Sequence, residues 1–101
     1  MTVACVLSGE HGRYALSGAL HFANARELLA SGLRAFAGQS TIEIDLKDLT
    51  SADSAGLAVL LAWVERARAH GQRLQLGPLP VQLAAIARVC DIEQMLTAAS
   101  V

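Results

Sequence analysis

The chain has 101 residues, nine acidic and eight basic side chains, and a formal net charge of −1. This length predicts one domain, 1–101, that can bury a core without disulfides or metals. The balanced charge, with no basic cluster, argues against a dedicated nucleic-acid-binding surface. Hydrophobic residues make up 53% of the chain and aromatic residues only 4%, so aliphatic side chains must fill the core. Part of this apolar surplus is expected at a partner interface.

The N-terminal residues lack the basic segment and continuous apolar run of a signal peptide. The longest apolar run, Leu57 to Val64, has eight residues, far fewer than the roughly 20 that span a bilayer. We therefore expect a soluble, cytoplasmic protein that does not insert into the membrane. Cys5 and Cys90 both lie among apolar neighbours and are expected to be reduced, buried thiols.

The first third of the chain predicts a hairpin followed by a helix. Two short apolar runs separated by turn residues are typical of paired strands. Asn24 with Glu27 three residues later forms a capping-box pattern, and the apolar residues that follow recur with helical spacing. Gly38 suits the left-handed position after a helix. The predicted elements are strands at 3–7 and 13–16, a turn at 8–12, and a helix from Asn24 to Phe36.

The middle of the chain predicts a strand, a helix and a second strand. Apolar residues alternate with acidic ones over 42–46, which indicates a strand with one buried face. A loop is expected at 47–52, a helix at 54–70 and a strand at 74–76. The two strands of such a unit are parallel and joined by a right-handed crossover. Further helices are predicted at 81–89 and 91–96. The whole is an α/β fold with a mixed sheet of four or five strands and about four helices.

The sequence Asp53-Ser54-Ala55-Gly56-Leu57 stands where the predicted loop opens the second helix. The first N–H groups of a helix have no partners within it and carry partial positive charge. A phosphate on Ser54 would lie favourably against them, and Gly56 would let a neighbouring backbone approach closely. The structural alternative is equally simple, because Asp and Ser are among the best N-cap residues.

The order of these elements and the Asp53–Leu57 turn after an apolar strand resemble a STAS domain over nearly the whole chain. The resemblance implies the fold of anti-sigma factor antagonists and of STAS subunits of transporters. In such antagonists the serine of this turn is phosphorylated by a partner serine kinase, which switches binding off. That serine corresponds to Ser54.

Three segments, 18–22, 53–61 and 83–87, look more specifically like the small STAS subunit of Mla-type phospholipid ABC transporters. This resemblance implies a cytoplasmic subunit that binds the transporter's ATPase subunit and supports its assembly or activity, with any membrane association made through that complex. The turn of such subunits often carries Thr where this chain has Ser54, so the hydroxyl is kept and the antagonist remains the alternative.

The outer face of the second helix is the predicted docking surface. Its sole Trp and a nearby Arg are residue types that often dominate interfaces. The alternative for Trp63 is a core position against the neighbouring helix. A phosphate on Ser54, beside Asp53, is expected to prevent partner binding at this surface without unfolding the chain. The candidate partner-binding residues are Asp53, Ser54, Ala55, Val59, Trp63 and Arg66.

No pattern in the chain indicates catalysis. The histidines His11, His21 and His70 are not at metal-ligand spacing with either cysteine, so no metal site is expected. Residue 52 is Ala, which removes the Gly-x-Ser-x-Gly pattern around Ser54. No glycine-rich phosphate or dinucleotide loop occurs, so no cofactor is expected. We therefore expect a protein that is not an enzyme.

Overall fold

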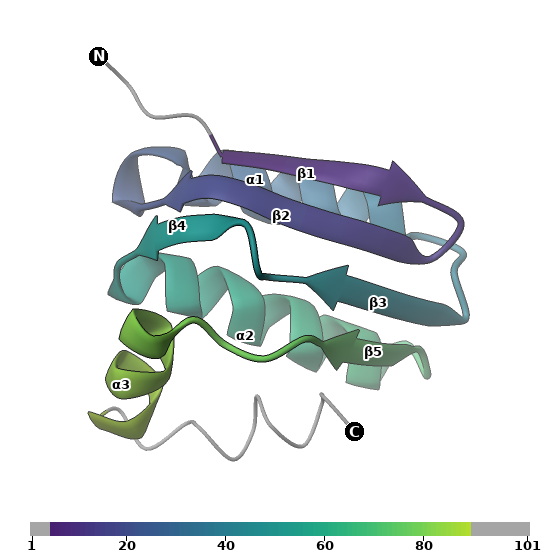
Figure 1. Ribbon diagram of the computed structural model, residues 1–101. Helices are drawn as coiled ribbons and strands as arrows, with labels where there is room; N and C mark the ends of the chain where they lie inside the picture. The colour runs from purple at the N-terminus through teal and green to yellow at the C-terminus, as the bar shows by residue number, and fades with distance from the viewer. Residues whose placement is uncertain (1–4, 90–101) are drawn as a thin grey trace.

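The computed structural model describes residues 5–89 (Figure 1). It contains both strands and helices along the chain, as the sequence predicted for an α/β fold. In chain order they are β1 (Cys5–Glu10), β2 (Arg13–Leu20), α1 (Phe22–Phe36), β3 (Thr41–Asp45), β4 (Leu49–Ala52), α2 (Ser54–Ala69), β5 (Arg73–Leu76) and α3 (Val81–Val89).

The five strands form one mixed sheet. β1 pairs antiparallel with β2, and β3 and β4 both pair parallel with β2. β3 and β4 follow one another along the same edge of β2, which Figure 1 shows as one interrupted line of strand. β3 also pairs parallel with β5, as predicted for the strand–helix–strand unit. The predicted mixed sheet is therefore confirmed.

The loop predicted at 47–52 is wrong in its second half, because β4 forms there. Four residues with two hydroxyl side chains show no alternating pattern, so nothing local indicates a strand. The pairing comes from β2, where the amide N–H of Gly18 donates to the carbonyl of Asp48 at 3.1 Å and Thr50 Oγ1 donates to the carbonyl of Gly18 at 2.9 Å. This strand brings the chain to the start of α2.

The hairpin turn and the start of the first helix also differ from their predicted positions. The hairpin turn is only His11-Gly12, both with positive φ (57° and 83°), as a two-residue turn between twisted strands requires. α1 begins earlier than predicted, after His21, whose backbone N–H donates to Asn24 Oδ1 at 2.9 Å. Asn24 is thus the third helical residue and not the N-cap. The predicted helix 91–96 lies outside the described residues.

The core lies between the sheet and two helices. α1 and α2 lie behind the sheet in Figure 1, so one sheet face is covered and the other is open. Alternate residues of β3 and β5 are buried on the covered face, which follows from the two-residue period of a strand. Within residues 5–89 no helix has the length and apolar character needed to cross a bilayer. Fully buried aliphatic side chains include Leu16, Leu20, Ile42, Ile44, Leu46, Leu57, Leu60 and Leu83.

Candidate functional site

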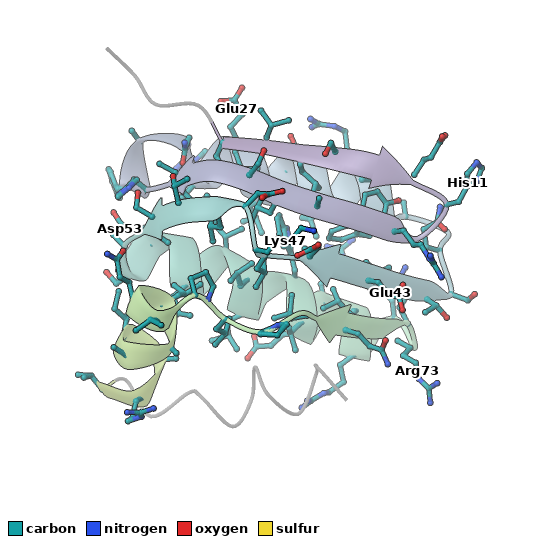
Figure 2. The ribbon with its side chains drawn as sticks, viewed as in Figure 1. His11, Glu27, Glu43, Lys47, Asp53 and Arg73 are labelled. Atoms are coloured by element: carbon teal, nitrogen blue, oxygen red, sulfur yellow. The ribbon has the colours of Figure 1, made fainter. Side chains whose placement is uncertain are left out.

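Asp53 connects the starts of two helices. It is the N-cap of α2, where its Oδ1 accepts a hydrogen bond from the backbone N–H of Gly56 at 3.0 Å. Its Oδ2 accepts from the backbone N–H of Phe22, the first residue of α1, at 3.1 Å. Figure 2 shows Asp53 at the end of the sheet where α2 begins. One carboxylate therefore joins α1 and α2 at the same edge.

His21 adds a second set of contacts to this carboxylate. Its Nδ1 lies 3.5 Å from Asp53 Oδ2, and its Nε2 lies 2.9 Å from the Oγ of Ser51 on β4. Burial raises the pKa of Asp53, but the hydrogen bonds from Gly56 and Phe22 and the nearby His21 outweigh it, so the net pKa is lowered. The carboxylate is thus held in its charged form. We call this cluster (His21, Phe22, Ser51, Asp53 and Ser54) the turn site.

Ser54 is the first residue of α2 and is exposed. Because Asp53 caps the helix, the Ser54 hydroxyl is not used as the cap and makes no hydrogen bond to another described residue. It is therefore open to a partner or a modifying enzyme. Gly56 allows the close packing predicted for it, since a Cβ there would lie 2.6 Å from the carbonyl oxygen of Leu20.

Two large apolar side chains, one in the turn site and one at the start of α3, are exposed to solvent. Phe22 is 84% exposed and Val81, at the start of α3, is 87% exposed. The neighbours of Val81 line a small pocket with Ser51, which places the start of α3 beside β4. We call Phe22, Ser54 and Val81 the docking surface. No sequence pattern predicted Phe22 or Val81 as functional, because one apolar residue at a helix start is also typical of a core position.

Trp63 and Val59 do not belong to an exposed surface, so this part of the predicted docking surface is wrong. Trp63 is 1% exposed and Val59 4%. The Trp63 indole N–H donates to the carbonyl of Leu29 at 3.3 Å, and its ring packs edge-on against Phe36 at 5.3 Å. The core alternative for Trp63 is confirmed. α2 packs against both the sheet and α1, so its buried arc is wider than one helix face.

Arg66 is exposed but does not lie near Ser54. Arg66 follows Ser54 by twelve positions, which correspond to about 18 Å along a helix. Arg66 lines a hollow of about 470 Å³ near the other end of α2, together with His70 and Gln72. Of the six predicted partner-binding residues, the structure therefore groups Asp53, Ser54 and Ala55 at the start of α2.

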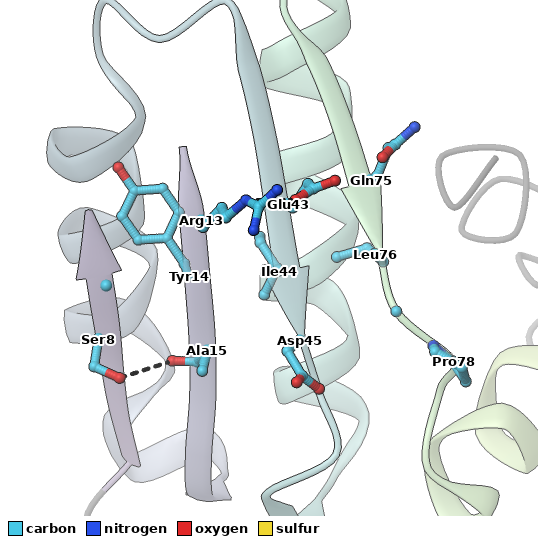
Figure 3. Close-up of a pocket in the computed structure, with 12 residues that line it drawn as sticks. Ser8, Arg13, Tyr14, Ala15, Glu43, Ile44, Asp45, Gln75, Leu76 and Pro78 are labelled. Atoms are coloured by element: carbon cyan, nitrogen blue, oxygen red, sulfur yellow. Dashed lines mark hydrogen bonds and ion pairs between the residues drawn. The ribbon is translucent and has the colours of Figure 1, made fainter. Parts of the chain in front are cut away.

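A shallow hollow of about 660 Å³ lies on the open face of the sheet (Figure 3). Its polar side chains mostly contact one another or the backbone. Arg13 pairs with Glu43 at 3.4 Å, and Ser8 Oγ donates to the carbonyl of Ala15 at 3.5 Å. Within residues 5–89 no three His, Cys, Asp or Glu side chains gather as metal ligands would. We therefore place the candidate site at the start of α2.

Cys5 on β1 is half-buried, and this burial raises its thiol pKa to about 11. At neutral pH the thiol is protonated and a poor nucleophile. Cys5 is a free thiol, and Cys90 lies outside the described residues.

The sequence matches the family model described as "Mlab, STAS domain" over residues 3–97. The chain therefore belongs to the STAS domain family. None of the curated proteins compared with it matches.

Solved structures share this fold. The Bacillus cell fate determinant SpoIIAA in its phosphorylated form is 17% identical with a TM-score of 0.67, over 88% of this chain and 85% of that one. The anti-sigma factor antagonist SpoIIAA in its unphosphorylated form is 22% identical with a TM-score of 0.62, over 87% and 82%. A crystal structure of Mglu is 20% identical with a TM-score of 0.59, over 75% of this chain but 20% of that one.

Proposed function

We propose that the chain is a non-enzymatic binding module of the anti-sigma factor antagonist type, controlled by phosphorylation of Ser54. Its partner is a serine kinase that docks on Phe22, Ser54 and Val81 and is released once Ser54 carries a phosphate. The observation that carries the proposal is the exposure of Phe22 and Val81, at the starts of α1 and α3, together with a Ser54 hydroxyl that bonds to no other described residue. The likeness to an antagonist known in phosphorylated and unphosphorylated forms supports it.

The chemistry of the docking surface fits this switch. An apolar side chain such as Phe22 contributes to binding by leaving water, and an aromatic ring is a common interface anchor. A phosphate on Ser54 brings about −1.5 to −2 charges, which an apolar partner surface must desolvate. Ser54 lies outside the core, so the modified chain keeps its fold. The switch therefore acts on binding.

The first test compares two exposed apolar residues. We expect Phe22→Ala to weaken partner binding at least about tenfold, as loss of an interface anchor does. Val89→Ala, which removes an equally exposed side chain at the far end of α3, should leave binding unchanged. Affinity purification from the native cell, followed by calorimetry with the captured partner, measures both. Equal affinities for the two variants would contradict the proposed docking surface.

The second test concerns the switch. Phosphoserine at position 54 should abolish kinase binding while circular dichroism shows an intact fold, and Ser54→Ala should bind permanently. A phosphorylated chain that binds as tightly as the unmodified one would rule out the switch.

A second candidate function is the small STAS subunit of an Mla-type phospholipid ABC transporter. The description of the matching family model names Mlab, and this observation favours it. In this case the docking surface binds the transporter's ATPase subunit, and Ser54 contributes only its hydroxyl. Mass spectrometry of the captured partner separates the candidates, because it identifies either a serine kinase or an ABC ATPase.

A further inference from the structure

Some of the N–H groups at the start of α2 are already occupied. Asp53 Oδ1 accepts from the N–H of Gly56 at 3.0 Å. The N–H of Leu57 donates to the backbone carbonyl of Asp53 at 3.1 Å. A phosphate on Ser54 would compete with Asp53 for the N–H of Gly56, so the helix N–H groups would offset only part of its charge. Its charge needs another partner.

His21 is the cationic candidate beside this position. The ring is half-buried, and its Nδ1 lies 3.5 Å from the carboxylate of Asp53, the residue that precedes Ser54. Among residues 5–89, Asp53 is the one charged group within ion-pair distance of His21. β4 also contacts the ring, through the neutral hydroxyl of Ser51.

In the described part of the chain, the basic side chains of the surrounding helices stand further along those helices. β4 has no ionisable side chain, and α3 has its basic residue, Arg88, in its last turn. On α1, the exposed Arg26 follows His21 by five positions, more than one helical turn. On α2, Asp53 is the cap and the basic residues are in the last turn. A dianionic phosphate next to Asp53 would thus create strong local negative charge.

We propose that His21 is the counter-ion of a phosphoryl group on Ser54. This inference rests on the proposed modification of Ser54 and names the residue that senses it. A protonated imidazole beside the phosphate and Asp53 offsets the added charge, because opposite charges a few ångströms apart attract even near the surface. His21 immediately precedes Phe22, whose N–H is bound to the same carboxylate. Phosphorylation therefore also acts on the backbone that carries the docking anchor.

The test places phosphoserine at position 54 by genetic encoding, so that no kinase or binding partner is needed. ³¹P NMR then follows the second ionisation of the phosphate between pH 4 and 8 in the original chain and in His21→Gln. Glutamine keeps hydrogen-bonding capacity but cannot carry a charge. We expect the midpoint to lie about half a unit lower with His21 than with Gln, a roughly threefold change in the proton equilibrium.

His70→Gln is the matched control, because His70 lies just past the far end of α2 and its loss should leave the ³¹P midpoint unchanged. A midpoint that is equal in the original chain and in His21→Gln overturns the proposal.

If His21→Gln fails to fold, ¹⁵N NMR of the His21 ring replaces the ³¹P comparison. The ring should contain more imidazolium at pH 7 in the phosphorylated chain than in the unmodified one, and an unchanged ring spectrum overturns the proposal. Failure of the proposed function would appear separately, as absence of kinase binding.

Discussion

At the scale of single residues, Asp53 has the largest number of interactions in the turn site. It caps α2, receives the first N–H of α1 and lies within ion-pair distance of His21. The motif Asp53-Ser54-Ala55-Gly56-Leu57 therefore has two parts. The carboxylate has a structural role that the best N-cap residues share, and the neighbouring Ser54 hydroxyl makes no hydrogen bond to another residue in the described part of the chain. Of the two alternatives that the sequence left open, the cap is Asp53, and a functional role for Ser54 stays a proposal.

The lowered pKa of Asp53 predicts how stability depends on pH. A carboxylate whose pKa is lower in the folded chain stabilises the fold above its ordinary value near 3.8, and this contribution is lost as the pH falls below it. We expect Asp53→Asn to lower the free energy of unfolding by about 0.5–1 kcal/mol at pH 7, since the group is partly open to solvent. Urea denaturation should show this difference shrinking towards pH 3.

The exposed Asp48, whose side chain makes no hydrogen bond or ion pair with another described residue, provides the matched control, because Asp48→Asn should leave the unfolding free energy nearly unchanged at both pH values. An Asp53→Asn difference that is equal at pH 7 and pH 3 would show that its charge contributes nothing.

At the scale of the elements, the contact between α1 and α2 depends on one glycine. A Cβ on Gly32 would overlap the ring of Trp63. Trp63 in turn packs edge-on against Phe36, which does the same against Tyr14 at 5.1 Å. The three rings connect α2 through α1 to β2, so the two helices approach closely only because position 32 has no side chain.

Gly32→Ala tests which of two opposed effects is larger. Alanine favours a helix by about 1 kcal/mol over glycine, whereas overpacking a core typically costs about 1–3 kcal/mol. We expect a net loss of stability, measured as a lower urea midpoint. Ser31→Ala on the same helix should change the free energy of unfolding little.

Trp63→Leu should lower the free energy of unfolding less in the Gly32→Ala chain than in the original chain, because the smaller side chain relieves the overlap. Strictly additive effects would contradict the proposed overlap.

At the scale of the whole molecule, the strands and the three described helices contribute side chains to one hydrophobic core. Trp63 is the only tryptophan of the chain and lies in the centre of this core. Its fluorescence therefore reports on the contact of α1, α2 and the sheet together. The docking surface lies at one end of this body, where α1, α2 and α3 begin, and the opposite end holds the hollow beside Arg66.

This arrangement predicts a single cooperative unfolding transition. Tryptophan fluorescence and far-ultraviolet circular dichroism should give the same urea midpoint, with a slope of about 1 kcal/mol/M expected for a small domain. Phe22→Ala should leave both midpoints unchanged, because Phe22 contributes little to the core. Two separate midpoints would show that the turn end or the sheet unfolds independently.

Local patterns in the sequence were sufficient to predict the α/β class, the parallel strands around residues 42–46 and 74–76, and the start of α2 at Ser54. Alternation, helical spacing and capping chemistry depend on neighbouring residues and are visible in a single chain. Only the tertiary structure decided that residues 49–52 form a strand and that Trp63 is buried. It also brought His21 to Ser51 and Phe22 to Asp53, which are 30 and 31 positions apart. Contacts over such distances leave no periodic signal, because they are created by the packing of elements against one another.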